Sequence, residues 1–185
     1  MKNKILIGII AVIVLVILYG WSTYNGLVSN REAVDNQWAQ VETQYQRRID
    51  LIPNLVETVK GMMKQEQSIF GQLASARANY AGAKTVEGKV SAANAVESSF
   101  GRLLAIMENY PELKSSNNVQ TLMTQLEGTE NRVSVERKRF NDMIQAYNLS
   151  TKKFPSSMIA SIFGFTEKSY FQSVSGAEIA PKVEF

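Results

Sequence analysis

The most constraining feature of the sequence is an N-terminal apolar stretch that contains no charge. No charged residue occurs between Lys4 and Arg31, and positions 5–18 read ILIGIIAVIVLVIL. A helix needs about 20 mostly apolar residues to cross the hydrocarbon core of a bilayer, with about 17 as the short limit. We therefore expect a transmembrane anchor over residues 5–22. Its membrane-facing residues are expected to be Ile5, Leu6, Ile7, Ile9, Ile10, Val12, Ile13, Val14, Leu15, Val16, Ile17, Leu18, Tyr19 and Trp21.

The residues at the two ends of this stretch predict its orientation. Lys2 and Lys4 flank one end, and the cytoplasmic flanks of membrane helices carry an excess of Lys and Arg. Tyr19, Trp21 and Tyr24 lie at the other end, and their amphipathic rings favour the headgroup layer. We expect residues 1–4 in the cytoplasm, a single pass through the cell (inner) membrane, and the body of the chain in the periplasm or outside the cell.

A cleaved secretory signal is the competing interpretation of the same stretch. Lys2 and Lys4 make an n-region, and Gly20-Trp21-Ser22 offers a small-x-small cleavage site. The apolar stretch is longer than a usual signal, however, and Trp occupies the middle of the cleavage site. The amphipathic pattern also continues past the site without a loop. These features favour retention of the segment as an anchor.

Beyond the anchor, apolar residues recur at three- and four-residue steps, which is the spacing of amphipathic helices. The first stripe continues from the anchor to Ile52, and we expect Pro53 to break or kink this helix. Further helices are expected over residues 54–81, from 90 to 107, from 117 or 118 to the region 148–150, and over 156–163, where Ser156 caps the start and Gly164 ends the helix.

These patterns predict an all-α fold, because no segment shows the alternation of a strand. A single transmembrane helix is expected to continue into an antiparallel bundle of long helices over residues 23–153. A short helix and tail follow over residues 154–185. Residues 166–185 show no sustained period, so we expect an extended or partly disordered segment there. Apolar tail residues that either fold back on the bundle or meet a partner are Phe163, Phe165, Tyr170, Phe171, Val174, Ile179, Val183 and Phe185.

The sequence contains neither Cys nor His. This excludes Ser-His-Asp and Cys-His relays, disulfides and the usual zinc and haem sites. The carboxylates considered for acid–base or cation chemistry form no recognised set; they are Asp50, Glu57, Glu66, Glu127 and Glu130. Methionines 62, 63 and 107 have the helical spacing of core residues. We therefore predict no enzymatic activity, no catalytic residues, no cofactor and no metal site.

The net charge of +3 does not indicate nucleic-acid binding. Lys2 and Lys4 flank the anchor, and without them the 20 basic residues become 18 against 17 acidic ones. The remaining basic clusters, Arg47-Arg48 and residues 137–139, are interleaved with acids. We therefore predict no nucleic-acid partner.

Three arginines occupy positions where the apolar stripes predict a core residue: Arg31, Arg48 and Arg137. A charge held against a bundle interior needs a partner, because its desolvation is costly. The candidate partners are Asp50, Glu130 and Glu136. Either each arginine reaches solvent along the edge of the bundle, or an arginine–carboxylate network fixes the helix register or opens to bind a ligand.

Several long motifs resemble the LemA family of bacterial membrane proteins. They are RRIDLIPNLVETVKG at 47–61, YPELK at 110–114, TENRVSVERKRFNDMIQAYN at 129–148, Phe154-Pro155, Tyr170-Phe171 and APKVEF at 180–185. The resemblance covers nearly the whole chain. It implies a single-pass anchor followed by a helical bundle, no established enzymatic activity, and an envelope partner by analogy.

The resemblance also marks polar positions without assigning them a role. They are Arg47, Arg48, Asp50, Asn54, Glu130, Asn131 and Arg132, and the motif further includes Pro53, Tyr147 and Asn148. We call the first seven the motif polar residues.

We therefore predict a membrane-anchored helical interaction or scaffold protein of the bacterial cell envelope. Its expected partners are the lipid bilayer and an envelope or membrane protein, and self-association as a homo-oligomer stays open. The alternative is a ligand-sensing or carboxylate-dependent hydrolytic domain with a polar site around Arg48, Asp50 and Glu130. A concave site open to water favours this alternative, whereas closed ion pairs between helices favour the scaffold.

Overall fold

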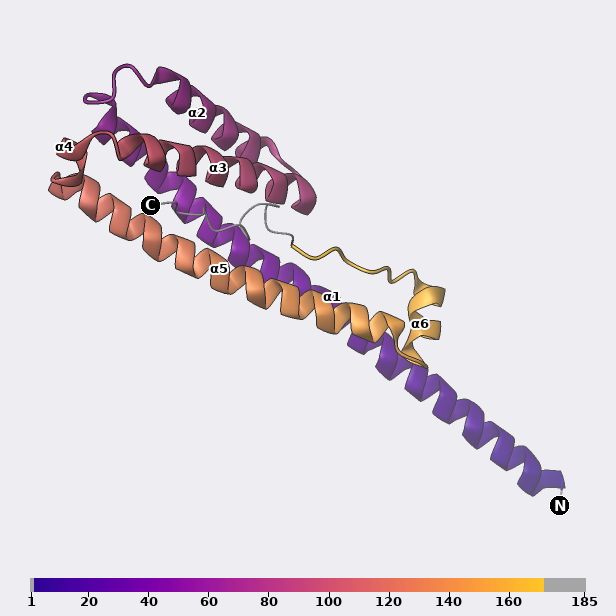
Figure 1. Ribbon diagram of the computed structural model, residues 1–185. Coiled ribbons are helices and arrows are strands. Elements are labelled where there is room, and N and C mark those ends of the chain that lie inside the picture. Colours follow the sequence, from indigo (N-terminus) through magenta and orange to yellow (C-terminus); the bar gives the residue numbers. More distant parts are fainter. Residues whose placement is uncertain (1, 172–185) are drawn as a thin grey trace, which may run out of the picture. The chain divides into compact units, whose positions relative to one another are not determined.

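A computed structural model describes residues 2–171 of the 185-residue chain. The helices, in chain order, are α1 (Lys2–Lys60), α2 (Gln67–Gly82), α3 (Val86–Met107), α4 (Pro111–Lys114), α5 (Asn117–Lys152) and α6 (Ser156–Phe163) (Figure 1). No strand occurs among the described residues, and the helices pack into a bundle, which confirms the predicted all-α fold. The tail beyond Phe171, with Val174, Ile179, Val183 and Phe185, lies outside the described residues.

Helix α1 contains the apolar stretch and continues without interruption to Lys60. The large apolar side chains between Ile5 and Leu18 are 47–66% exposed. This part of α1 is long and apolar enough to cross a membrane. The stripe that follows it is buried as predicted, at Leu27, Val34, Trp38, Val41, Tyr45, Arg48 and Ile52.

Of the two outcomes expected at Pro53, a break or a kink, the break is wrong, because Pro53 lies inside α1. A proline inside a helix costs about 3 kcal/mol, since it lacks an amide donor and crowds the preceding turn. Ile52, Leu55 and Val59 flank it and are at most 1% exposed. Burying a side chain of this size contributes about 1.5–3 kcal/mol, so the packing of these three residues outweighs the proline.

The chain turns at residues 61–66 instead, so the helix expected over 54–81 is divided between α1 and α2. The amides of Met62 and Met63 both donate to the carbonyl of Val59, each at 3.0 Å. Met63 is fully buried below this turn, whereas Met62 is exposed. The expectation of a core position is therefore wrong for Met62 and confirmed for Met63 and Met107.

The other helices lie close to their predicted positions. Helix α3 begins earlier than expected, because the Thr85 hydroxyl accepts a hydrogen bond from the Gly88 amide at 3.0 Å and caps the first turn. Helix α4 lies between the helices expected over 90–107 and from 117 or 118, where no helix was predicted. Ser156 is the first residue of α6 and not its cap, since Pro155 holds the cap position. Gly164 ends α6 with φ of 72°, as its permissive backbone predicts.

The chain divides into two compact units. Among the described residues, unit 1 consists of residues 2–41 with Glu136–Tyr170, and unit 2 consists of Glu42–Val135 with Phe171. Helices α1 and α5 supply residues to both units. Helix α6 belongs to unit 1, together with parts of α1 and α5.

In unit 1, α1 and α5 pack through aromatic and apolar side chains. The rings of Trp38 and Phe140 lie 5.4 Å apart, and Gln37 Nε2 donates to Glu136 Oε2 at 2.6 Å. Leu27, Val34, Ile144 and Tyr147 are also buried in this unit.

The segment after α6 is held against α5 by two residues of the LemA-like motif. The Tyr147 hydroxyl donates to the Thr166 carbonyl at 2.9 Å. Asn148 donates through Nδ2 to the Lys168 carbonyl at 2.8 Å and accepts from the Lys168 amide at 2.9 Å. Burial is the main reason that the pKa of Tyr147 is raised. Tyr147 and Asn148 therefore fix an extended segment that has no helical hydrogen bonds of its own.

Replacing Pro53 with Ala should stabilise the protein, because the substitution restores an amide that can donate to the Ile49 carbonyl without disturbing the packed stripe. We expect the free energy of unfolding to rise by about 1–2 kcal/mol after allowing for the added freedom of the unfolded chain. Thermal unfolding of the full chain in mild detergent, followed by circular dichroism, measures the change. Pro111→Ala is the matched control, because Pro111 is at the start of α4, where no helical amide bond is lost. A lower melting temperature for Pro53→Ala than for the native chain would contradict the explanation.

Candidate functional site

Arg48 is the buried charge around which the polar interior of unit 2 is arranged. Its side chain on α1 is only 8% exposed. Nη1 forms ion pairs with the Glu130 carboxylate on α5 and with Glu97 Oε1 on α3, the latter at 3.5 Å. The guanidinium carbon also lies 5.4 Å from the centre of the Phe100 ring, which adds a cation–π contact. One arginine thus joins three helices.

Further polar contacts surround this centre. The Tyr45 hydroxyl donates to Glu97 Oε1 at 3.4 Å, and the Tyr45 ring stacks on Phe171 with centroids 6.5 Å apart. Lys89 on α3 pairs with Glu42 on α1 and lies 5.3 Å from the centre of the Tyr80 ring on α2. Burial, and secondarily the Glu42 carboxylate, raise the pKa of Tyr80. We define the polar layer of unit 2 as these polar residues and the Arg48 centre: Glu42, Tyr45, Arg48, Tyr80, Lys89, Glu97 and Glu130.

The same region contains polar atoms that lack partners. Among the described residues, the buried side-chain atoms without a hydrogen bond are Gln44 Oε1, Arg48 Nε, Arg77 Nε, Tyr80 Oη and Asn94 Oδ1. An unpaired buried polar atom costs about 1–3 kcal/mol. The polar layer is therefore less stable than an apolar core of the same volume would be, which is typical of a layer that specifies how helices align.

The motif polar residues divide between two faces. Arg48 is buried and pairs with the partly exposed Glu130, whereas Arg47, Asp50 and Arg132 line an open groove between α1 and α5 of unit 2. This α1–α5 groove has a volume of about 470 Å³ and also contains Leu51, Gln125, Gly128 and Thr129. Asp50 accepts a hydrogen bond from Gln46 at 2.8 Å. Asn54 and Asn131 are exposed.

The site considered around Arg48, Asp50 and Glu130 is therefore assembled only in part. Arg48 and Glu130 are brought together, and Asp50 lies on the groove side. Of the three arginines at stripe positions, Arg48 is buried, Arg31 is exposed and Arg137 is partly exposed.

Sequence reasoning missed Glu97. Glu97 follows the buried Ala93 by four residues and precedes the buried Phe100 by three, so it sits beside the stripe of α3. A buried arginine in one apolar stripe needs a carboxylate beside the stripe of a neighbouring helix. Pairing Arg48 with such a carboxylate would have identified Glu97.

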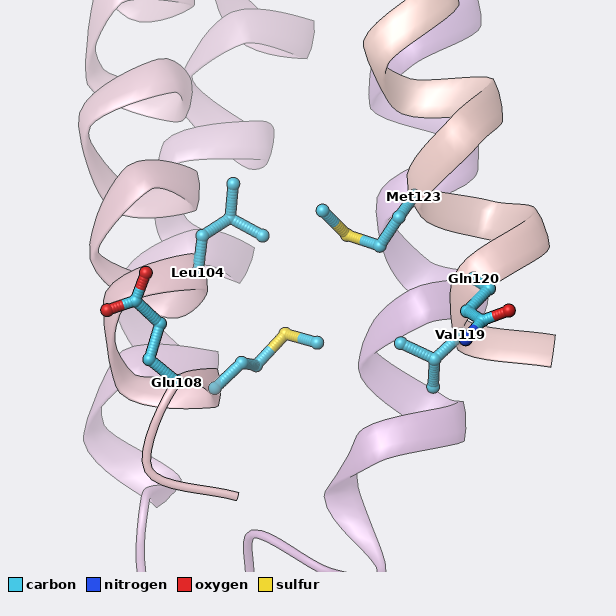
Figure 2. Close-up of a pocket in the computed structure, with 6 residues that line it drawn as sticks. Leu104, Glu108, Val119, Gln120 and Met123 are labelled. Carbon is cyan, nitrogen blue, oxygen red and sulfur yellow. The ribbon is translucent and has the colours of Figure 1, made fainter. Parts of the chain in front are cut away.

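A second concave feature of unit 2 is an apolar pocket of about 350 Å³ between α3 and α5. Leu104 and Met123 point toward each other across it, and Val119 lies beside Met123 (Figure 2). Met107 also lines it, and Glu108 and Gln120 are its polar residues. No group of three or more acidic side chains suited to a metal ion occurs among the described residues.

Comparison with known proteins places these features in a family context. The model of the LemA family matches residues 37–185. The chain is 28% identical to the magnetosome protein MamQ of Magnetospirillum gryphiswaldense and 26% identical to magnetosome protein MamQ 1 of Paramagnetospirillum magneticum. Each match covers 80% of this chain and 64% of the relative, so the chain spans less than two thirds of the length of these relatives.

Replacing Arg48 with Met should destabilise the bundle, because it leaves the Glu97 and Glu130 carboxylates without their shared cation. We expect a loss of about 2–4 kcal/mol in unfolding free energy; Glu130 is 44% exposed and regains hydration, which limits the loss. The double variant Arg48→Met/Glu97→Leu should recover much of it. Arg47→Met is the matched control and should change stability by less than about 0.5 kcal/mol, because Arg47 is exposed. Equal melting temperatures for Arg48→Met and Arg47→Met would rule out a stabilising ion pair.

Proposed function

Because the chain belongs to the LemA family, we propose that it is a membrane-anchored helical scaffold of the bacterial cell envelope that holds a protein partner beside the bilayer. The observation that carries the proposal is the pairing of the buried Arg48 with Glu97 and Glu130, which lie on two other helices. A sensor or hydrolase keeps its charged groups open to the ligand. Here the charge of Arg48 is paired with carboxylates on neighbouring helices. The surfaces that are left for recognition are grooves.

The α1–α5 groove is the surface that we assign to the partner. Arg47 and Arg132 contribute two guanidinium groups against the single carboxylate of Asp50, and Leu51 adds an apolar contact. Arginine forms paired hydrogen bonds with carboxylates and is enriched at protein interfaces. The groove therefore suits an acidic segment that carries an apolar side chain. No catalytic step is assigned to it.

The anchor is the second element of the proposal. The apolar stretch of α1 spans the cell membrane once, with Lys2 and Lys4 on the cytoplasmic side and the bundle in the periplasm or outside the cell. Confinement to a membrane raises the local concentration of a partner in the same membrane, so a modest groove is sufficient for binding.

The curated relatives extend the proposal only in general terms. Those relatives are named as magnetosome proteins. For this chain we infer the broader role of organising other proteins at a bacterial membrane.

Membrane topology can be tested cleanly, because the chain has no cysteine of its own. A cysteine at exposed Ser134 should react with a membrane-impermeant maleimide in intact cells. A cysteine at Asn3, on the opposite side of the apolar stretch, should react only after the cells are permeabilised. The reverse labelling pattern would place the bundle in the cytoplasm and contradict the proposed orientation.

The partner groove can be tested by photo-crosslinking in native membranes from position 125, which lines it. A discrete crosslinked product should form, and Arg47→Glu/Arg132→Glu should abolish it by reversing the charge of the groove. Lys138→Glu/Arg139→Glu makes the same change in charge at exposed positions of α5 and should leave the product intact. A product of twice the mass of the chain would identify self-association. A product that survives reversal of the groove charge would contradict the assignment.

A further inference from the structure

The segment from Phe154 to Phe165 carries no charged residue and exposes large apolar side chains. Its sequence is FPSSMIASIFGF, between Lys152-Lys153 and Glu167-Lys168. Phe154 is 80% exposed, Ile162 71% and Met158 57%. Met158 and Ile162 are four residues apart within α6 and so lie on one side of that helix, and Phe154 lies in the turn just before it. In water, a contiguous patch of this kind marks a surface that contacts something else.

The opposite side of this segment packs against the end of the apolar stretch. A side chain at Gly20 of α1 would contact Ile159 of α6 at 3.8 Å. The Tyr24 ring lies 4.8 Å from the Phe163 ring and 5.8 Å from the Phe165 ring. Within unit 1, α6 thus lies beside α1 where the apolar stretch gives way to the polar part of the helix (Figure 1).

The geometry of α1 sets the depth of this contact. A helix rises about 1.5 Å per residue, so about 20 residues cross a hydrocarbon core of about 30 Å. Counted from Ile5, this distance ends near Tyr24. The residues that touch α6 are therefore those at the outer boundary of the membrane, where Tyr19 and Trp21 also favour the headgroup layer.

We propose that α6 and Phe154 form a second membrane contact, in which the side chains of Phe154, Met158 and Ile162 insert among lipid acyl chains beside the anchor. This inference rests on the membrane anchor of the proposed function. Helix α6 is apolar on both sides, since Ile159 and Ala160 face inward while Met158 and Ile162 face outward. Ser156, Ser157 and Ser161 also belong to α6, but the large apolar side chains exposed on its outer side favour an apolar environment there.

Lipid is the favoured occupant because of what surrounds the segment. The segment packs through Ile159, Phe163 and Phe165 beside the end of the membrane-spanning part of α1, and the flanking Lys153 is exposed, as a lysine that reaches the headgroups would be. Lys152 pairs with Glu167 at 2.8 Å, and Lys168 pairs with Asp35 on α1. Together with Tyr147 and Asn148, these pairs hold both ends of α6, so its exposed face is presented in a fixed direction.

Spin labels on single cysteines in the full chain test this contact, after reconstitution into phosphatidylcholine–phosphatidylglycerol vesicles. The spectra of labels at Met158→Cys and Ile162→Cys should be broadened by oxygen, which partitions into lipid. A water-soluble nickel reagent should broaden these spectra little. The exposed position Ser134→Cys is the aqueous control and should show the opposite preference. Val12→Cys, in the middle of the apolar stretch, reports on the anchor itself.

The labels distinguish failure of this inference from failure of the anchor. Lipid exposure at position 12 with water exposure at 158 and 162 would overturn the interfacial contact and leave the anchor intact. Water exposure at position 12 would overturn the anchor, on which the inference depends. Labels at 158 and 162 that are immobilised and shielded from both reagents would assign the face to a protein or a second copy, which also overturns the proposal.

Discussion

One helix has to satisfy two environments, and the rest of the structure depends on this constraint. The first part of α1 exposes large apolar side chains in every direction, whereas its later part buries only the stripe that includes Leu27, Val41 and Val59. A bilayer solvates the first pattern, and a neighbouring helix covers the second. Helix α1 contributes to both units, and in each unit other helices cover the part of the stripe that lies there.

Arg48 shows why the covering face is not wholly apolar. Burying an unpaired guanidinium is too costly to persist, so α3 and α5 must each bring a carboxylate to the same level of α1. An apolar core tolerates small shifts of one helix along another. A set of ion pairs shared among three helices tolerates such shifts poorly, because each shift separates the charges. The partnerless atoms of Tyr80 and Asn94 indicate that alignment is obtained at some expense of stability.

The fold was largely predictable from sequence because helical periodicity reports which face is buried. Its failures have local causes. Pro53 looked like a break, but whether a proline ends a helix depends on the packing of Ile52, Leu55 and Val59, which periodicity does not measure. For the site, Arg48 and Glu130 were recognisable as a buried charge and a candidate partner. Two features of the site could not be predicted: the pairing of Glu97 with Arg48, and the position of Asp50 away from Arg48. Predicting them requires the rotation of each helix about its axis, which a single sequence leaves undetermined.

Arg47 and Arg48 are adjacent in one short motif but lie in two different environments, the groove and the interior. Successive positions on a helix are rotated by about 100°, so Arg48 enters the interior while Arg47 reaches the α1–α5 groove. The same rotation separates Glu130, which pairs with Arg48, from Thr129 and Arg132, which line the groove on α5. The inner pair sets the alignment of α1 and α5, and that alignment sets the spacing of the charges across the groove. In the proposed function, recognition at the groove and packing in the interior are thus coupled through the same two turns of helix.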